Sequence, residues 1–299
     1  MGGRGMAEGR KSGMTVERFP NNPIIRPNMD SRMGDNVNGP SLIRVPEWVK
    51  KPLGRYYLYF AHHKGEYIRL AYADRLAGPW KTYEPGTLKL NESFFTHHIA
   101  SPDVHADDAK REIRMYYHGI TDQGQKSRVA ISKDGIHFTA RPEILGEFYI
   151  RVFRWKDLHY ALAMPGILYR SADGLSGFRQ GPTLFGENMR HSALKLNGNK
   201  LSVFYSNIGD CPESILLSTI ELTPDWMTWK QSPPVTILQP QMEYEGVDLP
   251  LEASKRGWAP QRVRHLRDPA IFREGGRTYL LYSVAGEHGI AIAEIKRKS

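Results

Sequence analysis

Short apolar segments separated by turn residues follow one another along the whole chain. One of them begins with Arg267, Asp268 and Pro269, continues through the apolar residues 270–272, and is separated by a polar turn from a second strand-like run at residues 278–283. Runs of this length, rich in aromatic and β-branched residues, are typical of β-strands. No stretch keeps the 3.6-residue apolar period of a long helix. The pattern therefore predicts an all-β protein.

The same arrangement begins three of these segments. Pro40, Pro102 and Pro269 each have a polar residue four positions earlier and a branched apolar residue three positions earlier. A small or acidic residue and then an apolar residue follow each proline. A strand meander that recurs in this way is typical of propeller blades.

The repeat predicts a disordered tail at residues 1–18 and a single five-bladed β-propeller at residues 19–299. We expect the blades at about residues 36–83, 97–140, 147–180, 188–231 and 265–296. The last blade lacks an outer strand, which a strand near residues 19–26 would supply, joining the two ends of the ring. A β-sandwich is the alternative fold, but it gives no reason for the repeated strand opening.

Composition narrows the function. The 299 residues carry a formal charge of +9, but no run of Lys and Arg exceeds three residues, so no continuous phosphate-binding stripe is expected. Cys211 is the single cysteine, which excludes an intrachain disulfide and a cysteine metal cluster. Neither a secretory signal nor a membrane span is visible in the sequence. We expect a cytoplasmic protein without a nucleic-acid or membrane partner.

The chemistry is expected at the openings of the innermost strands, which line the central channel of a propeller and bring distant residues together. These openings are rich in carboxylate, guanidinium and imidazole groups. We predict that seven of these residues bind substrate: Asn38, His98, Arg151, Arg190, His191, His265 and Arg267.

Two carboxylates facing each other across a pocket are what cleavage of a glycosidic bond requires. Asp103 and Asp268 each adjoin one of the repeated prolines, on opposite sides of it, and are expected near the axis. The alternatives are a salt bridge between Asp268 and Arg267, and a strand-capping role for Asp103.

The sequence resembles glycoside hydrolase family 43 and its five-bladed relatives, families 32, 68, 117 and 130. Residues 100–105, with Asp103 after the proline, resemble the second blade of family 43, where this aspartate modulates the proton affinity of the acid. Residues 267–269 resemble the Arg-Asp-Pro motif of the wider group. The resemblance implies a glycosidase acting on an oligosaccharide.

The sequence departs from the family 43 pattern at the first blade. The family's general base is an aspartate before the first proline, where this chain has Gly39, so Asp268 is the substitute for base or nucleophile. The general acid is implied to be Glu147 or Glu245, the latter within a long loop at residues 233–264. Loops of that length often line or cover a site.

The basic residues suggest the class of substrate. Arg151, Arg190 and Arg267 come from three blades and suit an acidic sugar or a phosphate co-substrate, although structural pairing with Glu147, Glu187 and Asp268 is an equal alternative. A phosphorylase and a non-catalytic sugar-binding propeller are therefore the rival functions. We expect no cofactor and no catalytic metal. A structural cation in the channel, with His191 as a ligand, is a further alternative that the resemblance implies.

Overall fold

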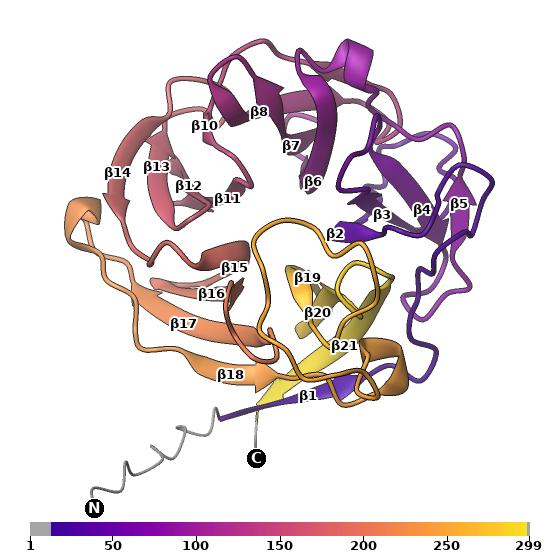
Figure 1. The fold of residues 1–299 in the computed structure, drawn as a ribbon. Coiled ribbons are helices and arrows are strands. Elements are labelled where there is room, and N and C mark those ends of the chain that lie inside the picture. Colours follow the sequence, from indigo (N-terminus) through magenta and orange to yellow (C-terminus); the bar gives the residue numbers. More distant parts are fainter. Residues whose placement is uncertain (1–12, 298–299) are drawn as a thin grey trace, which may run out of the picture.

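The computed structural model describes residues 13–297, which form five antiparallel sheets arranged as blades around a central axis (Figure 1). This confirms the predicted five-bladed β-propeller. The helical elements among the described residues are three short 3₁₀ helices: η1 (Leu90–Glu92), η2 (Trp226–Thr228) and η3 (Glu243–Glu245).

The strands of each blade run from the axis outward. Blade 1 contains β2 (Asn38–Arg44), β3 (Tyr56–Ala61), β4 (Arg69–Ala73) and β5 (Lys81–Tyr83). Blade 2 contains β6 (Thr96–Asp107), β7 (Glu112–Thr121) and β8 (Gly124–Ser132), which pairs with both β9 (Phe138–Ala140) and β10 (Gly146–Glu147). Blade 3 contains β11 (Arg151–Trp155), β12 (Leu158–Ala163), β13 (Ile167–Ser171) and β14 (Arg179–Thr183).

Blade 4 contains β15 (Met189–Asn197), β16 (Lys200–Asn207), β17 (Ile215–Glu221) and β18 (Val235–Leu238). Blade 5 contains β19 (Arg267–Glu274), β20 (Arg277–Ser283), β21 (Ile290–Arg297) and β1 (Met14–Arg18). An insertion between β18 and β19 passes over the centre of the ring (Figure 1).

The core lies between the blades, because the middle strands bury both of their faces. Successive residues of β3 point to opposite sides: Tyr57 packs in a cluster with Met115 of blade 2, and Leu58 packs in another with Leu281 of blade 5. Five apolar clusters of this kind in the described chain each join two neighbouring blades. Burial on both faces explains why these strands are almost continuously apolar in sequence.

The ring is closed by a strand earlier in the chain than expected. Residues 14–18, which we predicted to be disordered, form β1 and pair with β21 throughout. The expected strand at residues 19–26 contributes only the isolated bridge between Ile25 and Ile290 and a few backbone hydrogen bonds. Prolines interrupt residues 19–26, whereas residues 14–18 alternate inward and outward as an outer strand does. The first 12 residues of the predicted tail lie outside the described residues.

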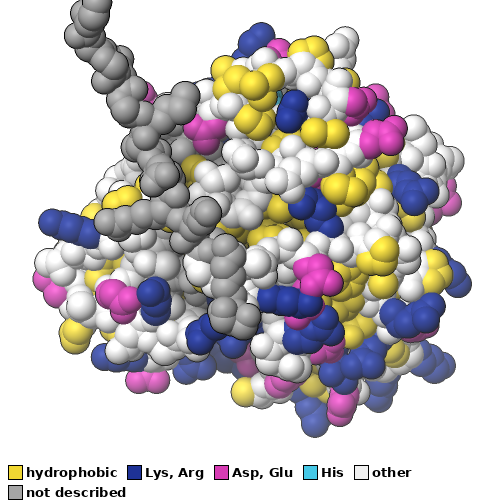
Figure 2. All heavy atoms as spheres, turned by 90° about the horizontal axis from the view of Figure 1, so that it is seen from below, with side chains coloured by type: hydrophobic (Ala, Val, Ile, Leu, Met, Phe, Trp, Pro, Cys, Tyr) yellow, Lys and Arg dark blue, Asp and Glu magenta, His cyan; other side chains and the backbone are white. Residues whose placement is uncertain are grey.

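On the side of the ring seen in Figure 2, basic side chains are interspersed with acidic ones and form no continuous band. No helix within residues 13–297 is long and apolar enough to cross a membrane.

Candidate active site

One residue at the mouth of each blade has a left-handed backbone. These residues are Gly39, Ser101, Tyr149, His191 and Asp268, with φ between 47° and 60°. In four of the five blades the pairing with the next strand shifts register at this residue, and in three blades a proline follows it. Non-glycine residues rarely adopt this conformation, and functional sites are where it clusters. The repeated proline motif therefore encodes a bulge at the top of the inner strand.

A central cavity of about 160 Å³ opens at these bulges. It is lined by residues from all five blades and from the insertion: Asn38, His63, His98, Ala100, Ser101, His118, Gln125, Phe148, Tyr149, Met164, Arg190, His191, Ile208, Arg256, Gly257, Asp268 and Glu287. Of the predicted substrate-binding residues, Asn38, His98, Arg190 and His191 border this cavity.

Asp268 is held on its wall by two hydroxyl groups and an imidazole. The Tyr149 hydroxyl donates a hydrogen bond to Oδ1 (2.9 Å) and the Ser283 hydroxyl donates to Oδ2 (2.9 Å). His191 Nδ1 lies 3.0 Å from Oδ1. Burial, and then the negative charge of Glu287, raise the pKa of the Asp268 carboxyl against the opposing effects of Arg190 and the two hydroxyls. A carboxyl of this kind is suited to hold a proton and give it up.

A second carboxylate, Glu287, borders the same cavity from the loop between β20 and β21. The amides of Asn36 and Asn38 donate to its Oε2 at 2.8 and 3.1 Å, and Arg267 donates to Oε1 at 3.2 Å. His63 Nδ1 lies 3.5 Å from Oε2. Burial opposes ionisation of Glu287, but His63, Asn36 and Arg267 outweigh it and lower its pKa to about 2. Glu287 therefore carries a fixed negative charge at neutral pH.

Sequence reasoning missed Glu287 because it considered only where inner strands begin. The turns between the second and third strands of a blade also reach the mouth, and His63 and Glu287 both lie on such turns. Asn36 and Asn38, at the opening of the first blade, were the sequence signal that a polar partner such as Glu287 must lie nearby, because a buried amide needs a hydrogen-bond partner.

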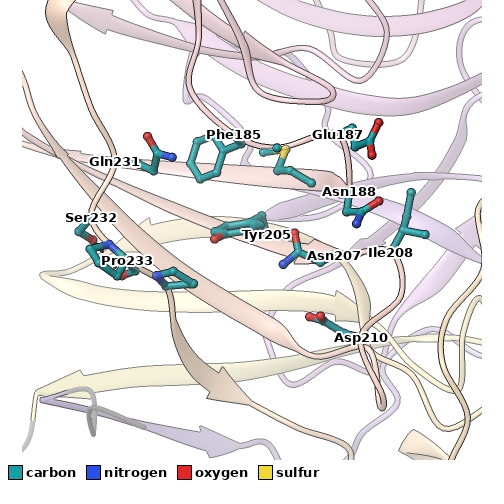
Figure 3. Close-up of a pocket in the computed structure, with 13 residues that line it drawn as sticks. Phe185, Glu187, Asn188, Tyr205, Asn207, Ile208, Asp210, Gln231, Ser232 and Pro233 are labelled. Carbon is teal, nitrogen blue, oxygen red and sulfur yellow. Dashed lines mark hydrogen bonds between the residues drawn. The ribbon is translucent and has the colours of Figure 1, made fainter. Parts of the chain in front are cut away.

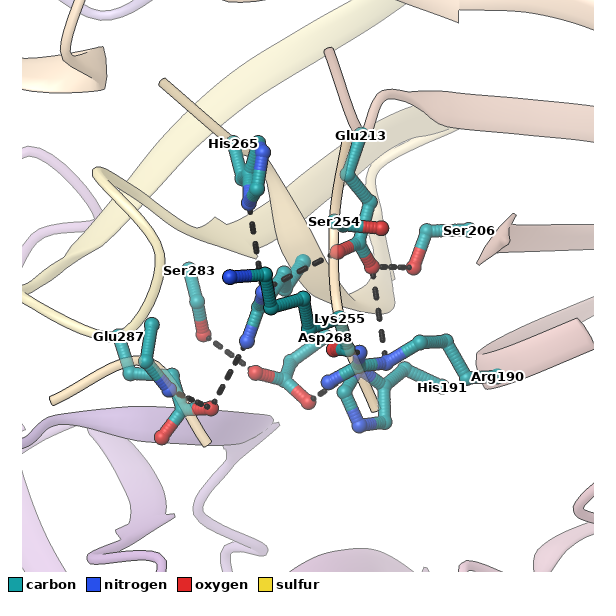
Figure 4. Close-up of polar contacts among 12 residues, drawn as sticks. Arg190, His191, Ser206, Glu213, Ser254, Lys255, His265, Asp268, Ser283 and Glu287 are labelled. Atoms are coloured by element: carbon teal, nitrogen blue, oxygen red, sulfur yellow. Dashed lines mark hydrogen bonds and ion pairs between the residues drawn. The ribbon is translucent and has the colours of Figure 1, made fainter. Parts of the chain in front are cut away.

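Two of the predicted substrate-binding arginines are instead part of a buried ion-pair network (Figure 4). Glu213, which is completely buried, has Arg267 Nε 3.0 Å from Oε2 and Arg190 Nε 3.6 Å from Oε1. Ser206 donates a 2.6 Å hydrogen bond to the same carboxylate. Arg190 also donates to the carbonyl of Lys255. Their charges are thus matched by protein groups.

Arg190 still borders the cavity, but Arg267 and Arg151 do not. The Arg151 guanidinium donates to the carbonyls of Ser192 and Ser101 at 3.0 Å each, and it stacks over the Tyr149 ring. Arg190 and Arg267 pair with Glu213 and Glu287. The predicted alternative, structural pairing of the arginines, had named other carboxylates: Glu147, Glu187 and Asp268. The three arginines therefore do not converge on the cavity, which only Arg190 of the three borders.

Asp103 lies away from the cavity. Its Oδ2 accepts a hydrogen bond from the backbone N–H of Val152 (2.8 Å) and lies 2.8 Å from His105 Nε2. The bulge adds one residue between Ser101, which borders the cavity, and Asp103, so the side chain of Asp103 faces blade 3. Asp103 and Asp268 do not share a hollow, and the predicted pairing of these two carboxylates is wrong.

The two glutamates predicted as the acid are also outside the cavity. Glu147, at the edge of blade 2, forms an ion pair with Lys126. Glu245 is completely buried and accepts bonds from Arg18, from the Tyr282 hydroxyl (2.8 Å) and from two backbone N–H groups of its own turn. A carboxylate satisfied in this way on the side of blade 5 cannot protonate a substrate at the axis.

Burial favours the neutral form of three histidines that border the cavity. Burial lowers the pKa values of His98, His118 and His191. His265 is buried beside the insertion and contacts the Glu252 carbonyl instead of bordering the cavity. Among residues 13–297, no group of three or more His, Cys, Asp or Glu side chains is placed to hold a metal ion. Arg190 Nε lies 3.3 Å from His191 Nδ1, so the surroundings of His191 do not fit the cation that the resemblance implied.

Comparison with known proteins gives one related sequence and many related folds. No family model matches the chain. Uncharacterized protein R118 of Acanthamoeba polyphaga mimivirus is 36% identical over 322 aligned residues, which cover 94% of this chain and 90% of the viral protein.

The solved structures with this fold include glycoside hydrolases. A thermostable family-43 glycoside hydrolase matches with a TM-score of 0.59 at 16% identity, over 88% of this chain and 89% of its own. A family-43 β-xylosidase/α-arabinofuranosidase from a compost metagenome, in complex with xylotriose, matches with a TM-score of 0.61 at 12% identity, over 94% of both chains.

A structure from family 130, described as mannoside phosphorylases that include hydrolases of β-1,2-mannosidic linkages in Candida mannan, has a TM-score of 0.65 at 11% identity. The alignment covers 96% of this chain and 95% of that one. At these identities the likeness shows the fold, and it confirms the resemblance to the family 43 type of propeller.

Proposed function

We propose that this chain, which belongs to the same family as uncharacterized protein R118 of Acanthamoeba polyphaga mimivirus, is a glycoside hydrolase that cleaves an oligosaccharide in its central cavity. One observation supports this above all. Two buried carboxyl groups border the same small cavity, and their surroundings move their pKa values in opposite directions, upward for Asp268 and down to about 2 for Glu287. Two neighbouring titratable groups whose pKa values are shifted apart are typical of a general acid and its ionised partner.

The proposed roles follow from these charges. Asp268 is the general acid, which protonates the oxygen of the leaving sugar. Glu287 stays ionised, stabilises the positive charge that develops on the sugar ring in the transition state, and accepts a proton from the attacking water. This assignment reverses the role expected for Asp268, which the sequence suggested as base or nucleophile.

The surroundings of Asp268 support its role. Neutral His191 offers Nδ1 as an acceptor for the proton of the carboxyl group at 3.0 Å. Trp258, on the insertion next to the cavity-lining Gly257, is partly exposed and its ring lies 6.3 Å from that of His63. An exposed indole beside the opening is suited to stack on a sugar ring.

The test uses leaving groups of different acidity. A leaving group that departs without protonation does not need the acid, so Asp268→Asn should lower kcat by about 100-fold or more on an oligosaccharide but much less on a dinitrophenyl glycoside of the same sugar. Glu287→Gln should slow both substrates. For wild type, kcat should fall as pH rises through the raised pKa of Asp268, because the acid is then deprotonated. Equal losses on both substrates for Asp268→Asn would remove it from this role.

A phosphorylase is the second candidate function. Arg256 borders the cavity and is exposed, and within residues 13–297 its side chain makes one hydrogen bond, to the Glu187 carbonyl at 3.3 Å. Its guanidinium is thus available to an incoming anion such as phosphate. Release of sugar phosphate that depends on added phosphate would support this function, and the same free sugar with and without phosphate would support hydrolysis.

A further inference from the structure

A second hollow, which we call the blade-4 groove, lies next to the central cavity, and Figure 3 shows the residues that line it. Its volume is about 540 Å³, and it is lined by Phe185, Gly186, Glu187, Asn188, Met189, Tyr205, Asn207, Ile208, Asp210, Gln231, Ser232, Pro233 and Pro234. Ile208 borders both the groove and the cavity. Arg256, on the cavity wall, donates to the backbone of Glu187 in the groove. The two hollows are therefore neighbours, with Ile208 and the contact between Arg256 and Glu187 at their boundary.

The groove presents polar side chains that the protein itself does not use. The amides of Asn188, Asn207 and Gln231 and the carboxylates of Glu187 and Asp210 make no side-chain hydrogen bond within residues 13–297. Together they offer both donors and acceptors along one channel. This combination suits a ligand with many hydroxyl groups.

The floor of the groove is apolar and rigid. Phe185 and Tyr205 are both buried, and their rings meet edge to face with centroids 4.9 Å apart. An apolar floor beneath polar walls matches a sugar, whose ring carries C–H groups on its faces and hydroxyls at its edges.

The charges of the groove indicate a neutral ligand. Glu187 and Asp210 are the charged residues among those that line it, and no Lys, Arg or His is present among them. Two unpaired carboxylates would repel a uronic acid or a sulfated sugar. The groove thus argues against the acidic substrate that the arginines suggested from sequence.

We propose that the blade-4 groove binds the distal sugars of a neutral oligosaccharide whose scissile bond lies in the central cavity. This inference rests on the proposed hydrolase function and extends it, because it makes the natural substrate an oligomer of uncharged sugars.

The first test compares two substrates of the same sugar, an aryl monoglycoside and a neutral tetrasaccharide. Asn207→Ala and Gln231→Ala should each lower the ratio of kcat/KM for the tetrasaccharide to that for the aryl glycoside by about five-fold or more. Asn197→Ala, at the opposite end of blade 4 and outside the groove, should leave that ratio unchanged. An unchanged ratio in both groove variants would overturn the proposal.

The second test is independent of turnover and separates the two proposals. Wild-type protein is titrated calorimetrically with neutral xylo- and manno-tetraoses and with the tetramer of galacturonic acid. Binding of a neutral tetraose that Asn207→Ala weakens and Asn197→Ala does not would support the groove, even if no glycoside is hydrolysed and the proposed function fails. Stronger binding of the acidic tetramer, or no binding of any neutral tetraose, would overturn it.

Discussion

Asp103 and Ser41 have the same role in neighbouring blades. The Ser41 hydroxyl accepts a hydrogen bond from the backbone N–H of Val104 in the next blade (2.9 Å), and the Asp103 carboxylate accepts one from Val152 in the blade after that (2.8 Å). Each side chain follows a repeated proline and ties one inner strand to the next. Asp103 is thus a connection between blades, and its acidity is not required for that task.

We expect Asp103→Ala to lower the free energy of unfolding by about 1–3 kcal/mol, because the buried N–H of Val152 loses its acceptor. Asp103→Asn keeps an acceptor oxygen and should recover most of this loss. Urea unfolding measures both. If Asp103 instead tuned the acid, as the resemblance implied, Asp103→Asn would shift the pH dependence of kcat while leaving the stability near that of wild type.

Asp103 and Asp268 show how much of the site can be predicted from the sequence at the level of single residues. The repeated proline correctly marked the mouths of the blades, and it placed Asp268 on the wall of the cavity. The motif could not show that the residue before the proline faces the cavity while the residue after it faces the next blade. The two side chains point in different directions because of the left-handed bulge, which is not visible in the sequence pattern. Glu287 lies in a turn with no motif, and only the fold brings it to Asp268.

At the scale of elements, β1 is fastened to the insertion by a buried ion pair. Arg18, at the end of β1, donates two hydrogen bonds to Glu245 at 2.7 and 3.0 Å. The Glu245 carboxylate is completely buried, and the Arg18 side chain is 15% exposed. Tyr282 of β20 donates to the same carboxylate. Glu245 therefore joins the first strand, the last blade and the insertion.

Arg18→Ala should lower the free energy of unfolding by about 3 kcal/mol, because it leaves Glu245 as an uncompensated buried charge. Lys296→Ala is the matched control, since Lys296 pairs with Glu17 on the exposed edge of the same two strands, where water screens the pair, and it should cost much less than Arg18→Ala. Chemical denaturation of both variants gives the comparison. Equal losses would mean that the buried pair adds nothing beyond a surface contact.

The sequence predicted that a strand near the N-terminus closes the ring, but not which residues form that strand. The missing outer strand of the last blade indicated that the N-terminal region must supply it, and the alternation in residues 14–18 was the usable signal. The length of the insertion indicated a contribution to the site, and it does reach the cavity, through Arg256 and Gly257. Glu245 was predicted as the acid because it lies in this long loop, and the length of a loop does not reveal that the partly buried Arg18 already pairs with the carboxylate.

At the scale of the whole molecule, two buried glutamates near the axis hold several blades together. Glu287 of blade 5 binds Asn36 and Asn38 at the first mouth, and Arg267 links it to Glu213 of blade 4. The five blades themselves could be predicted because each repeats an apolar meander. The ion-pair network could not be predicted from the sequence, because its residues lie far apart in the chain and do not recur at a regular spacing.

The network predicts a loss of stability in acid. The pKa of Glu287 falls from an ordinary 4.5 to about 2 on folding, so its contribution is complete above about pH 4.5 and disappears as pH falls toward 2. That contribution amounts to roughly 3 kcal/mol. Urea unfolding at intervals between pH 7 and pH 3 should show a shallower decline for Glu287→Gln than for wild type. Parallel curves would show that Glu287 ionises equally well in the unfolded chain.

Gly39 leaves the opening of the first blade without a side chain. A β-carbon at this position would stand 3.2 Å from the Ser101 α-carbon, in a backbone conformation that already disfavours any side chain. Any side chain at residue 39 would therefore require the main chain of Ser101 to move aside. Acidic groups at this part of the axis must therefore be supplied by the adjoining blade 5, which carries both Asp268 and Glu287.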